Sequence, residues 1–165
     1  MTKIIFTTDY FSLEQDSNGI NFIRSGDAMV VVPVSDSGQV LLVKEYAPAF
    51  GGEALVLPGG EVEVGEAQAD TANRELQEEI GYRAGQLDLI GEIRPWAKYL
   101  AVRNYVYLAR KLMPSKLKGD EAHRITVHPI SLDDIGSLIG AGELHDAVTI
   151  AALYLVREHL KSDGR

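Results

Sequence analysis

Residues 60–82 of this chain read GEVEVGEAQADTANRELQEEIGY, and this stretch decides how the rest of the sequence is interpreted. At about 100° of rotation per helical residue, Glu75, Glu78 and Glu79 fall within about a third of the helix circumference. The neighbouring sector holds the apolar residues Ala69, Ala72, Leu76 and Ile80. The pattern predicts a helix with one acidic face and one face that packs on the core.

The acidic face is suited to a divalent cation. Like charges this close repel by about 0.2–0.5 kcal/mol per pair on an exposed helix, and a bound cation reverses that penalty. Ligands that are all oxygen favour Mg²⁺ or Mn²⁺. Two glutamates following a third on a helix are usually only a solvated face, so this pattern indicates a metal site only together with its flanking residues.

Those flanks predict a strand, a turn and a helix. Leu55, Val56 and Leu57 form a short apolar run that Pro58 and the glycines after it would end. Glycine lets the backbone turn sharply and aim carbonyls at a cation. Glu66 suits the positive end of the helix dipole, and Gly81 is placed to cap the other end.

The whole segment resembles the Nudix box, the signature of the metal-dependent Nudix hydrolases. Its match consists of Gly60, Glu66, Arg74, Glu75, Leu76, Glu78, Glu79, Gly81 and Tyr82. Such spacing has a chance probability of about 10⁻⁷ in a chain of this length. The resemblance implies an α/β fold in which a mixed β-sheet lies between α-helices.

The resemblance also implies residue roles. The metal ligands would be Glu75, Glu78, Glu79 and the carbonyl of Gly59, whereas Gly60, Glu66 and Arg74 would be structural. Glu78 and Glu79 would also be catalytic. In the ADP-ribose hydrolase branch an acid on a later loop often acts as the base, which favours Glu121 here, with Asp120 as the alternative.

That branch is the best match over most of the chain. The similar segments are residues 26–33, 43–46, 117–121 and 149–160. The likeness implies cleavage of ADP-ribose or a related nucleoside diphosphate derivative into two phosphomonoesters. It also implies a homodimer formed with the help of a β-hairpin region at residues 1–25.

Two departures from the branch concern substrate binding. Ala47 stands where many members have arginine, and Val56 stands where they often have glutamate. Substitute cations for the phosphates are Arg24, Arg94, Lys98 and Arg103. Because arginine binds phosphate through two donors, Arg24 and Arg94 are preferred. Tyr46 and Trp96 are the candidate stacking surfaces for a base.

Composition limits the possible functions. The chain has 165 residues, of which 45% are hydrophobic, so we expect one domain over residues 1–165. A net charge of −8 argues against a nucleic acid polymer as partner, but not against a small anionic substrate. The absence of a signal-like N-terminus and of a long apolar run predicts a cytoplasmic protein without membrane contact.

Turn signals and periodicity predict the remaining elements. Asn18-Gly19 indicates a hairpin over residues 4–25. We expect strands at residues 28–34, 40–44, 86–93 and 100–108, a short helix after Ser131 and a helix over residues 146–161.

Two alternatives remain open from the sequence. The first is a Nudix hydrolase of dinucleoside polyphosphates or nucleotide sugars, which would use the same chemistry. The second is a non-catalytic ligand-sensing domain. Degenerate domains of that kind would lose box glutamates or the arginine, whereas Arg74 and all the box glutamates are present.

Overall fold

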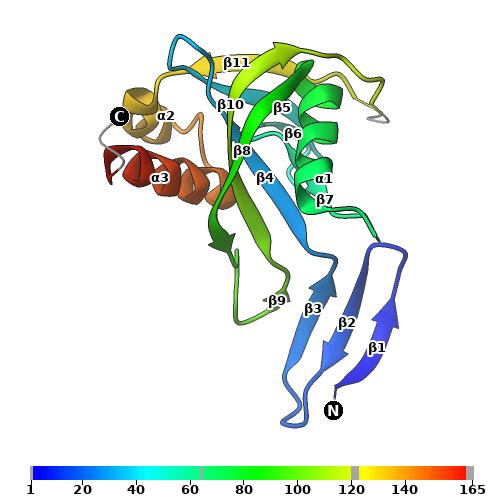
Figure 1. The fold of residues 1–165 in the computed structure, drawn as a ribbon. Coiled ribbons are helices and arrows are strands. Elements are labelled where there is room, and N and C mark those ends of the chain that lie inside the picture. Colours follow the sequence, from blue (N-terminus) through cyan, green and yellow to red (C-terminus); the bar gives the residue numbers. More distant parts are fainter. Residues whose placement is uncertain (1, 64, 120–122, 163–165) are drawn as a thin grey trace.

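The computed structural model describes residues 2–63, 65–119 and 123–162, and its strands form three sheets (Figure 1). The first has the order β1-β2-β3-β9, with β1 Lys3–Thr7, β2 Phe11–Gln15, β3 Asn21–Ser25 and β9 Leu100–Ala101. The second has the order β7-β4-β10-β8, with β4 Ala28–Pro33, β7 Gly59–Glu61, β8 Tyr82–Ile93 and β10 Asn104–Pro114. The third has the order β11-β5-β6, with β5 Val40–Ala47, β6 Gly52–Val56 and β11 Thr126–Ile130.

The N-terminal region projects from the body of the molecule (Figure 1). The predicted hairpin at Asn18-Gly19 is confirmed between β2 and β3, where the Asp16 carboxylate accepts from the backbone N–H groups of Asn18 and Ile20 at 2.9 and 2.8 Å. However, residues 4–25 hold three strands rather than one hairpin. The chain also reverses before Phe11, whose N–H donates to Oγ1 of Thr8 at 3.0 Å.

The second sheet is mixed, because β10 runs parallel to β4 and antiparallel to β8. Side chains alternate across β4: Val32 joins a core with the C-terminal helices, while Met29 and Val31 join a core with the box helix. Helix α1, Gln68–Glu75, covers one side (Figure 1). Helices α2, Ile135–Gly140, and α3, Ala147–Ser162, lie on the other side. The predicted arrangement of a mixed sheet between helices is confirmed.

The box helix differs from the expected regular helix. After α1, residues Leu76–Ile80 form a π-helical turn, closed when the N–H of Gly81 donates to the Leu76 carbonyl. Gly81 caps it in the left-handed conformation with φ 77°, as predicted. Ala69 is exposed, so its assignment to the core is wrong, whereas Ala72, Leu76 and Ile80 are buried. The wider π turn changes the directions of the glutamates from those of an α-helix.

Two strand predictions also need correction. Gly59 and Gly60 belong to β7, which pairs with β4, and not to an open loop. The strand expected over residues 100–108 is split: β9 pairs with β3, and β10 starts at Asn104. Strand β4 and helix α3 occur where they were expected, whereas β5 extends to Ala47 and β8 begins earlier, at Tyr82. Ser131 precedes the short 3-10 turn Leu132–Asp134 that leads into α2. None of the helices in the described part of the chain has the length and apolar character needed to cross a bilayer.

Candidate active site

The box glutamates lie where α1 passes into the π turn. Glu75 and Glu79 are buried, with 8% and 6% of their surface exposed, and the side chain of Glu78 is 16% exposed. Charged groups are seldom buried to this extent unless other groups offset the loss of hydration. The predicted acidic face is therefore a set of carboxylates held within the protein and not a solvated surface.

Gly59 and Gly60 bring the backbone of β7 against this helix and against β4. A Cβ placed on Gly60 would lie 2.3 Å from Oε1 of Glu75, and one on Gly59 would lie 2.3 Å from the Met29 carbonyl oxygen. At Gly59 the backbone of Met29 and Val30 excludes a side chain, whereas at Gly60 a side chain would have to displace the Glu75 carboxylate. The glycines were expected in a free turn, whereas here close packing within β7 requires them; their site roles stay predictions.

Arg74 connects the segment before the helix with the carboxylates. Its Nε donates to Oε1 of Glu66 at 3.2 Å and its Nη2 to Oε2 at 3.3 Å. Oε2 of Glu66 also accepts from Oγ1 of Thr71 at 2.8 Å. The Arg74 hydrogen bonds, helped by Thr71, hold the pKa of Glu66 below its ordinary value, and the same contact raises the pKa of Arg74. Glu66 thus holds the segment before α1 against the helix through hydrogen bonds to Arg74 and Thr71. It is not the N-cap residue, because α1 begins at Gln68 and Ala67 is the N-cap.

The third guanidinium nitrogen of Arg74 lies between two of the proposed ligands. Its Nη1 is 2.8 Å from Oε1 of Glu75 and 3.2 Å from Oε2 of Glu78. Within residues 2–63, 65–119 and 123–162, no three His, Cys, Asp or Glu side chains are grouped closely enough to hold a metal ion. In this arrangement Glu75 and Glu78 share the Arg74 cation.

A cavity of about 190 Å³ opens beside Glu78 and Glu79. Lys116 and His123 line it as well, and Nζ of Lys116 donates to the backbone carbonyl of Glu78. The His123 ring lies 4.7 Å from the ring of Tyr46, so this predicted stacking residue is already in contact with another ring at the edge of the cavity. Lys116 was missed because nothing in a lone lysine distinguishes it from a surface charge. Glu121 and Asp120 lie outside the described residues.

A second cavity, of about 370 Å³, adjoins the glycines of β7. Gly59, Gly60, Glu45, Asn104 and Asp146 are among its lining residues. Sequence reasoning missed the last three as site residues. Asp146 could have been found as a helix cap before an apolar run, because its carboxylate accepts from the N–H of Thr149 at 2.7 Å.

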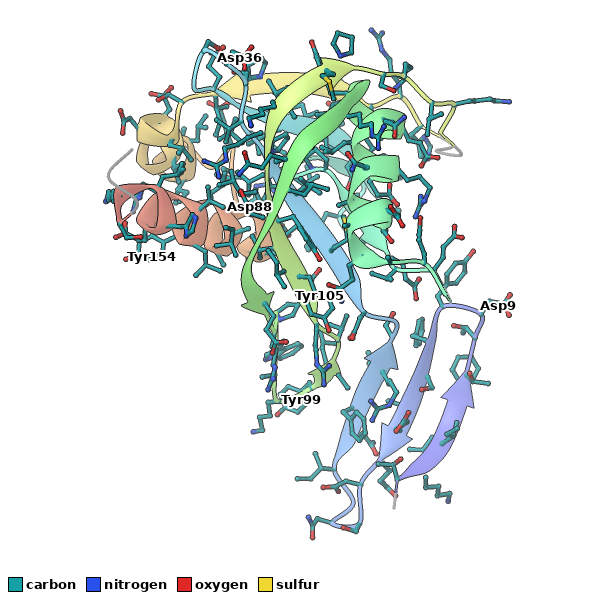
Figure 2. The ribbon with its side chains drawn as sticks, viewed as in Figure 1. Asp9, Asp36, Asp88, Tyr99, Tyr105 and Tyr154 are labelled. Atoms are coloured by element: carbon teal, nitrogen blue, oxygen red, sulfur yellow. The ribbon has the colours of Figure 1, made fainter. Side chains whose placement is uncertain are left out.

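The predicted arginines lie together in a third cavity, of about 520 Å³, which we call the arginine cavity. It is lined by Arg24, Ser25, Asp27, Arg94, Ala97, Leu100, Ala101, Val102 and Arg103. Trp96 is 60% exposed on the adjoining loop and makes an edge contact with Tyr99, whose position next to β9 is labelled in Figure 2. Lys98 does not line the cavity and lies over the Tyr99 ring, with Nζ 5.1 Å from its centre.

Comparisons with known proteins agree with this architecture. The NUDIX domain family model matches residues 24–153. The chain is 30% identical to ADP compounds hydrolase NudE of Escherichia coli (strain K12), over 98% of this chain and 89% of that protein. It is also 30% identical to ADP-ribose pyrophosphatase of Bacillus subtilis (strain 168), over 79% of this chain and 72% of that protein.

A solved structure extends the likeness to three dimensions. The crystal structure of an ADP compounds hydrolase superposes with a TM-score of 0.84 at 27% identity and covers 100% of this chain and 94% of its own. The family match spans the box, the sheet that carries its glycines and the first part of α3. The chain is therefore a member of the Nudix hydrolase family.

Proposed function

We propose that this protein is a metal-dependent diphosphatase that cleaves ADP-ribose or a related nucleoside diphosphate derivative into two phosphomonoesters. The observation that carries the proposal is the placement of three box carboxylates on one turn, with Gly60 packed against Glu75. The names of the two relatives support the ADP-linked substrate class.

The box residues are of the chemical type that a hard divalent cation takes, and the carboxylates would have to move closer together to share one ion, because no three such side chains among the described residues are grouped closely enough. Carboxylates of Glu75, Glu78 and Glu79 and the carbonyl of Gly59 would hold Mg²⁺ or Mn²⁺, both of which take oxygen ligands. The bare Cα of Gly60 keeps space free at the Glu75 carboxylate. When bound, the metal would neutralise the diphosphate and lower the pKa of a water.

The protein's own groups would orient the reaction. Arg74 would hold Glu75 and Glu78 until the cation replaces it as their partner, because its Nη1 contacts both carboxylates. Glu78 and Glu79 share a cavity with Lys116, whose ammonium group would attract a phosphate oxygen. Glu121 stays our candidate for the base that takes the proton of the attacking water.

Substrate recognition would involve two places, the arginine cavity and the edge of the cavity beside Glu78 and Glu79. Arg24 and Arg94 would bind anionic groups in the arginine cavity, and Trp96 would offer a flat surface at its rim. Tyr46 would stack on a substrate ring beside His123, whose ring it already contacts. The cytoplasmic location, the absence of nucleic acid and membrane partners, and the single domain over residues 1–165 stay predictions.

An assay of a substrate panel tests the function. ADP-ribose, nucleotide sugars and dinucleoside polyphosphates would be incubated with Mg²⁺ or Mn²⁺ in ¹⁸O-labelled water, and the products would be identified by mass. Glu79→Gln should lower turnover by more than about 100-fold while the melting temperature stays close to that of the wild type. Glu143→Gln, at an exposed residue after α2, is the control.

The outcomes separate the alternatives. Preference for dinucleoside polyphosphates or nucleotide sugars would replace the substrate assignment but keep the chemistry. Binding of nucleotides without release of any product would favour a ligand-sensing domain. Wild-type turnover in Glu79→Gln would contradict the metal role of the box.

We also propose that the chain forms a homodimer through the N-terminal sheet. Every residue of edge strand β1 is exposed, including Ile4, Ile5 and Phe6 at 61%, 48% and 55%. An exposed apolar edge strand invites pairing with another strand. Sedimentation should give a dimer for the wild type and a monomer for Phe6→Lys, with Phe50→Lys on an exposed turn as control. A monomeric wild type would refute the proposal.

A further inference from the structure

Three arginines converge on the arginine cavity although the chain carries a net charge of −8. Arg24 comes from β3, Arg94 follows β8, and Arg103 precedes β10. Arg24 is far in sequence from Arg94 and Arg103, and the two segments meet because β9 pairs with β3. Figure 2 places Tyr99 and Tyr105 in this same part of the molecule, between the N-terminal sheet and the body. The topology thus brings three guanidinium groups to one hollow of an acidic protein.

Each arginine lies beside an acidic side chain, and Arg24 and Arg94 are hydrogen-bonded to theirs. Nε of Arg24 donates to Oε1 of the buried Glu14 at 2.8 Å, and the guanidinium also lies over Phe22. Nε and Nη2 of Arg94 donate to Oε1 of Glu92 at 2.9 and 2.7 Å. Nη1 of Arg103 lies 3.9 Å from Oδ2 of Asp27.

The anchoring leaves donors for a ligand. Among the described residues, the hydrogen bonds of Arg24 use Nε alone and those of Arg94 use Nε and Nη2. Both Nη groups of Arg24 and the Nη1 of Arg94 are therefore available. An arginine held by one edge of its guanidinium loses less conformational freedom when it binds an oxyanion through the other edge.

The arginine cavity is distinct from the cavity of Gly59 and Gly60, but consecutive residues of the chain line the two. It shares no lining residue with the cavity of Gly59 and Gly60. Asp27 and Arg103 line the first, and the residues that follow each of them, Ala28 and Asn104, line the second. Ala28 and Asn104 are partners in the β4–β10 pairing, so the two hollows meet at this pair.

From these observations we propose that the arginine cavity binds a phosphate group that the substrate carries in addition to its scissile diphosphate. The inference rests on the proposed function. The box carboxylates and their cation would bind the scissile diphosphate. The arginines would bind a further phosphate, on the other side of Asn104, in the arginine cavity. Guanidinium groups match the geometry of phosphate oxygens, and a volume of about 520 Å³ leaves room for the sugar that carries the phosphate.

The additional phosphate has two chemical sources, a phosphate ester on a ribose or a third phosphate in a dinucleoside chain. Two matched pairs separate them: ADP-ribose with its 2′-phosphate ester, and diadenosine diphosphate with diadenosine triphosphate. Affinities would be measured by calorimetry in EDTA, where the proposed hydrolysis does not proceed. Turnover of the same compounds would be measured separately with Mg²⁺.

The wild type should bind the phosphate-rich member of one pair about tenfold more tightly than its partner. Arg94→Ala and Arg103→Ala should remove most of that difference, and because these side chains are 60% and 54% exposed, the fold should survive. Lys98→Ala removes the same charge from the same loop outside the cavity and should keep the difference.

Equal affinity for both members of each pair would overturn the proposal. An equal loss of affinity for both members in Arg94→Ala would also overturn the proposal, because the arginines would then bind the scissile diphosphate. A wild type that discriminates within a pair but hydrolyses neither member would refute the proposed reaction and leave the phosphate site supported.

Discussion

Gly60 packs directly against Glu75, so closely that a Cβ on the glycine would lie 2.3 Å from Oε1 and 2.7 Å from Cδ of the carboxylate. The glutamate has little freedom to move away, since its Oε1 also lies 2.8 Å from Nη1 of Arg74. The contact joins the start of the box to its helix. It gives a steric reason for a glycine that sequence alone marks only as part of a pattern.

Gly60→Ala should therefore reduce activity more than stability. The methyl group would push the Glu75 carboxylate out of place, and a displacement of about 1 Å at a reacting site can cost about 100-fold in turnover. Turnover and its dependence on Mg²⁺ concentration would be measured beside the melting temperature. Gly52→Ala is the control, because a Cβ there meets nothing within 4 Å. Wild-type kinetics in Gly60→Ala would contradict the steric role.

Arg74→Lys tests whether the geometry of the guanidinium matters beyond its charge. Lysine cannot contact Glu66 through two nitrogens while a third reaches Glu75 and Glu78. The free energy of unfolding in urea should fall by about 1–3 kcal/mol, the usual range for hydrogen bonds to charged groups. Arg83→Lys, at an exposed position in β8, should stay within about 0.5 kcal/mol of the wild type. Equal stability of Arg74→Lys and the wild type would show that charge alone is sufficient.

The pKa of Glu66 predicts how stability depends on pH. Arg74 and Thr71 lower this pKa from 4.5 in the folded protein, so the stabilisation is fully present above 4.5 and is lost as the pH falls through the folded value. Glu66→Gln should be less stable than the wild type at neutral pH, and the difference should shrink in acid. Urea unfolding across this range measures it, with exposed Glu63→Gln as control. A difference that does not change with pH would exclude Glu66 as its source.

The sequence predicted the parts of the fold that local patterns determine. The box helix, the Gly81 cap and strands β4 and β5 follow from periodicity and glycine positions, which act over a few residues. The split between β9 and β10 depends on pairing with β3, and the placement of Gly60 depends on Glu75. Such long-range contacts leave no periodic signal. The same applies to the arginines, whose convergence on one cavity follows from the topology.

One long-range contact supports the turn that leads into the box. Oγ1 of Thr149 in α3 accepts a hydrogen bond from the backbone N–H of Leu57 at 3.1 Å, across 92 residues of sequence and in a buried setting. Leu57 directly precedes the Pro58–Gly59–Gly60 segment, so the hydroxyl fixes the strand end from which the box glycines depart. An unsatisfied buried N–H costs about 1–3 kcal/mol.

Thr149→Val should therefore destabilise the protein by about 1–3 kcal/mol in urea and also lower turnover, because the methyl group that replaces the hydroxyl leaves the Leu57 N–H without an acceptor. Thr149→Ser keeps the hydroxyl and removes only a methyl group, so it should lose about 1 kcal/mol of stability and keep its turnover. The comparison separates packing from hydrogen bonding. If the serine variant loses as much turnover as the valine variant, the hydrogen bond has no role in placing the glycines, and α3 would then act on the site through packing alone.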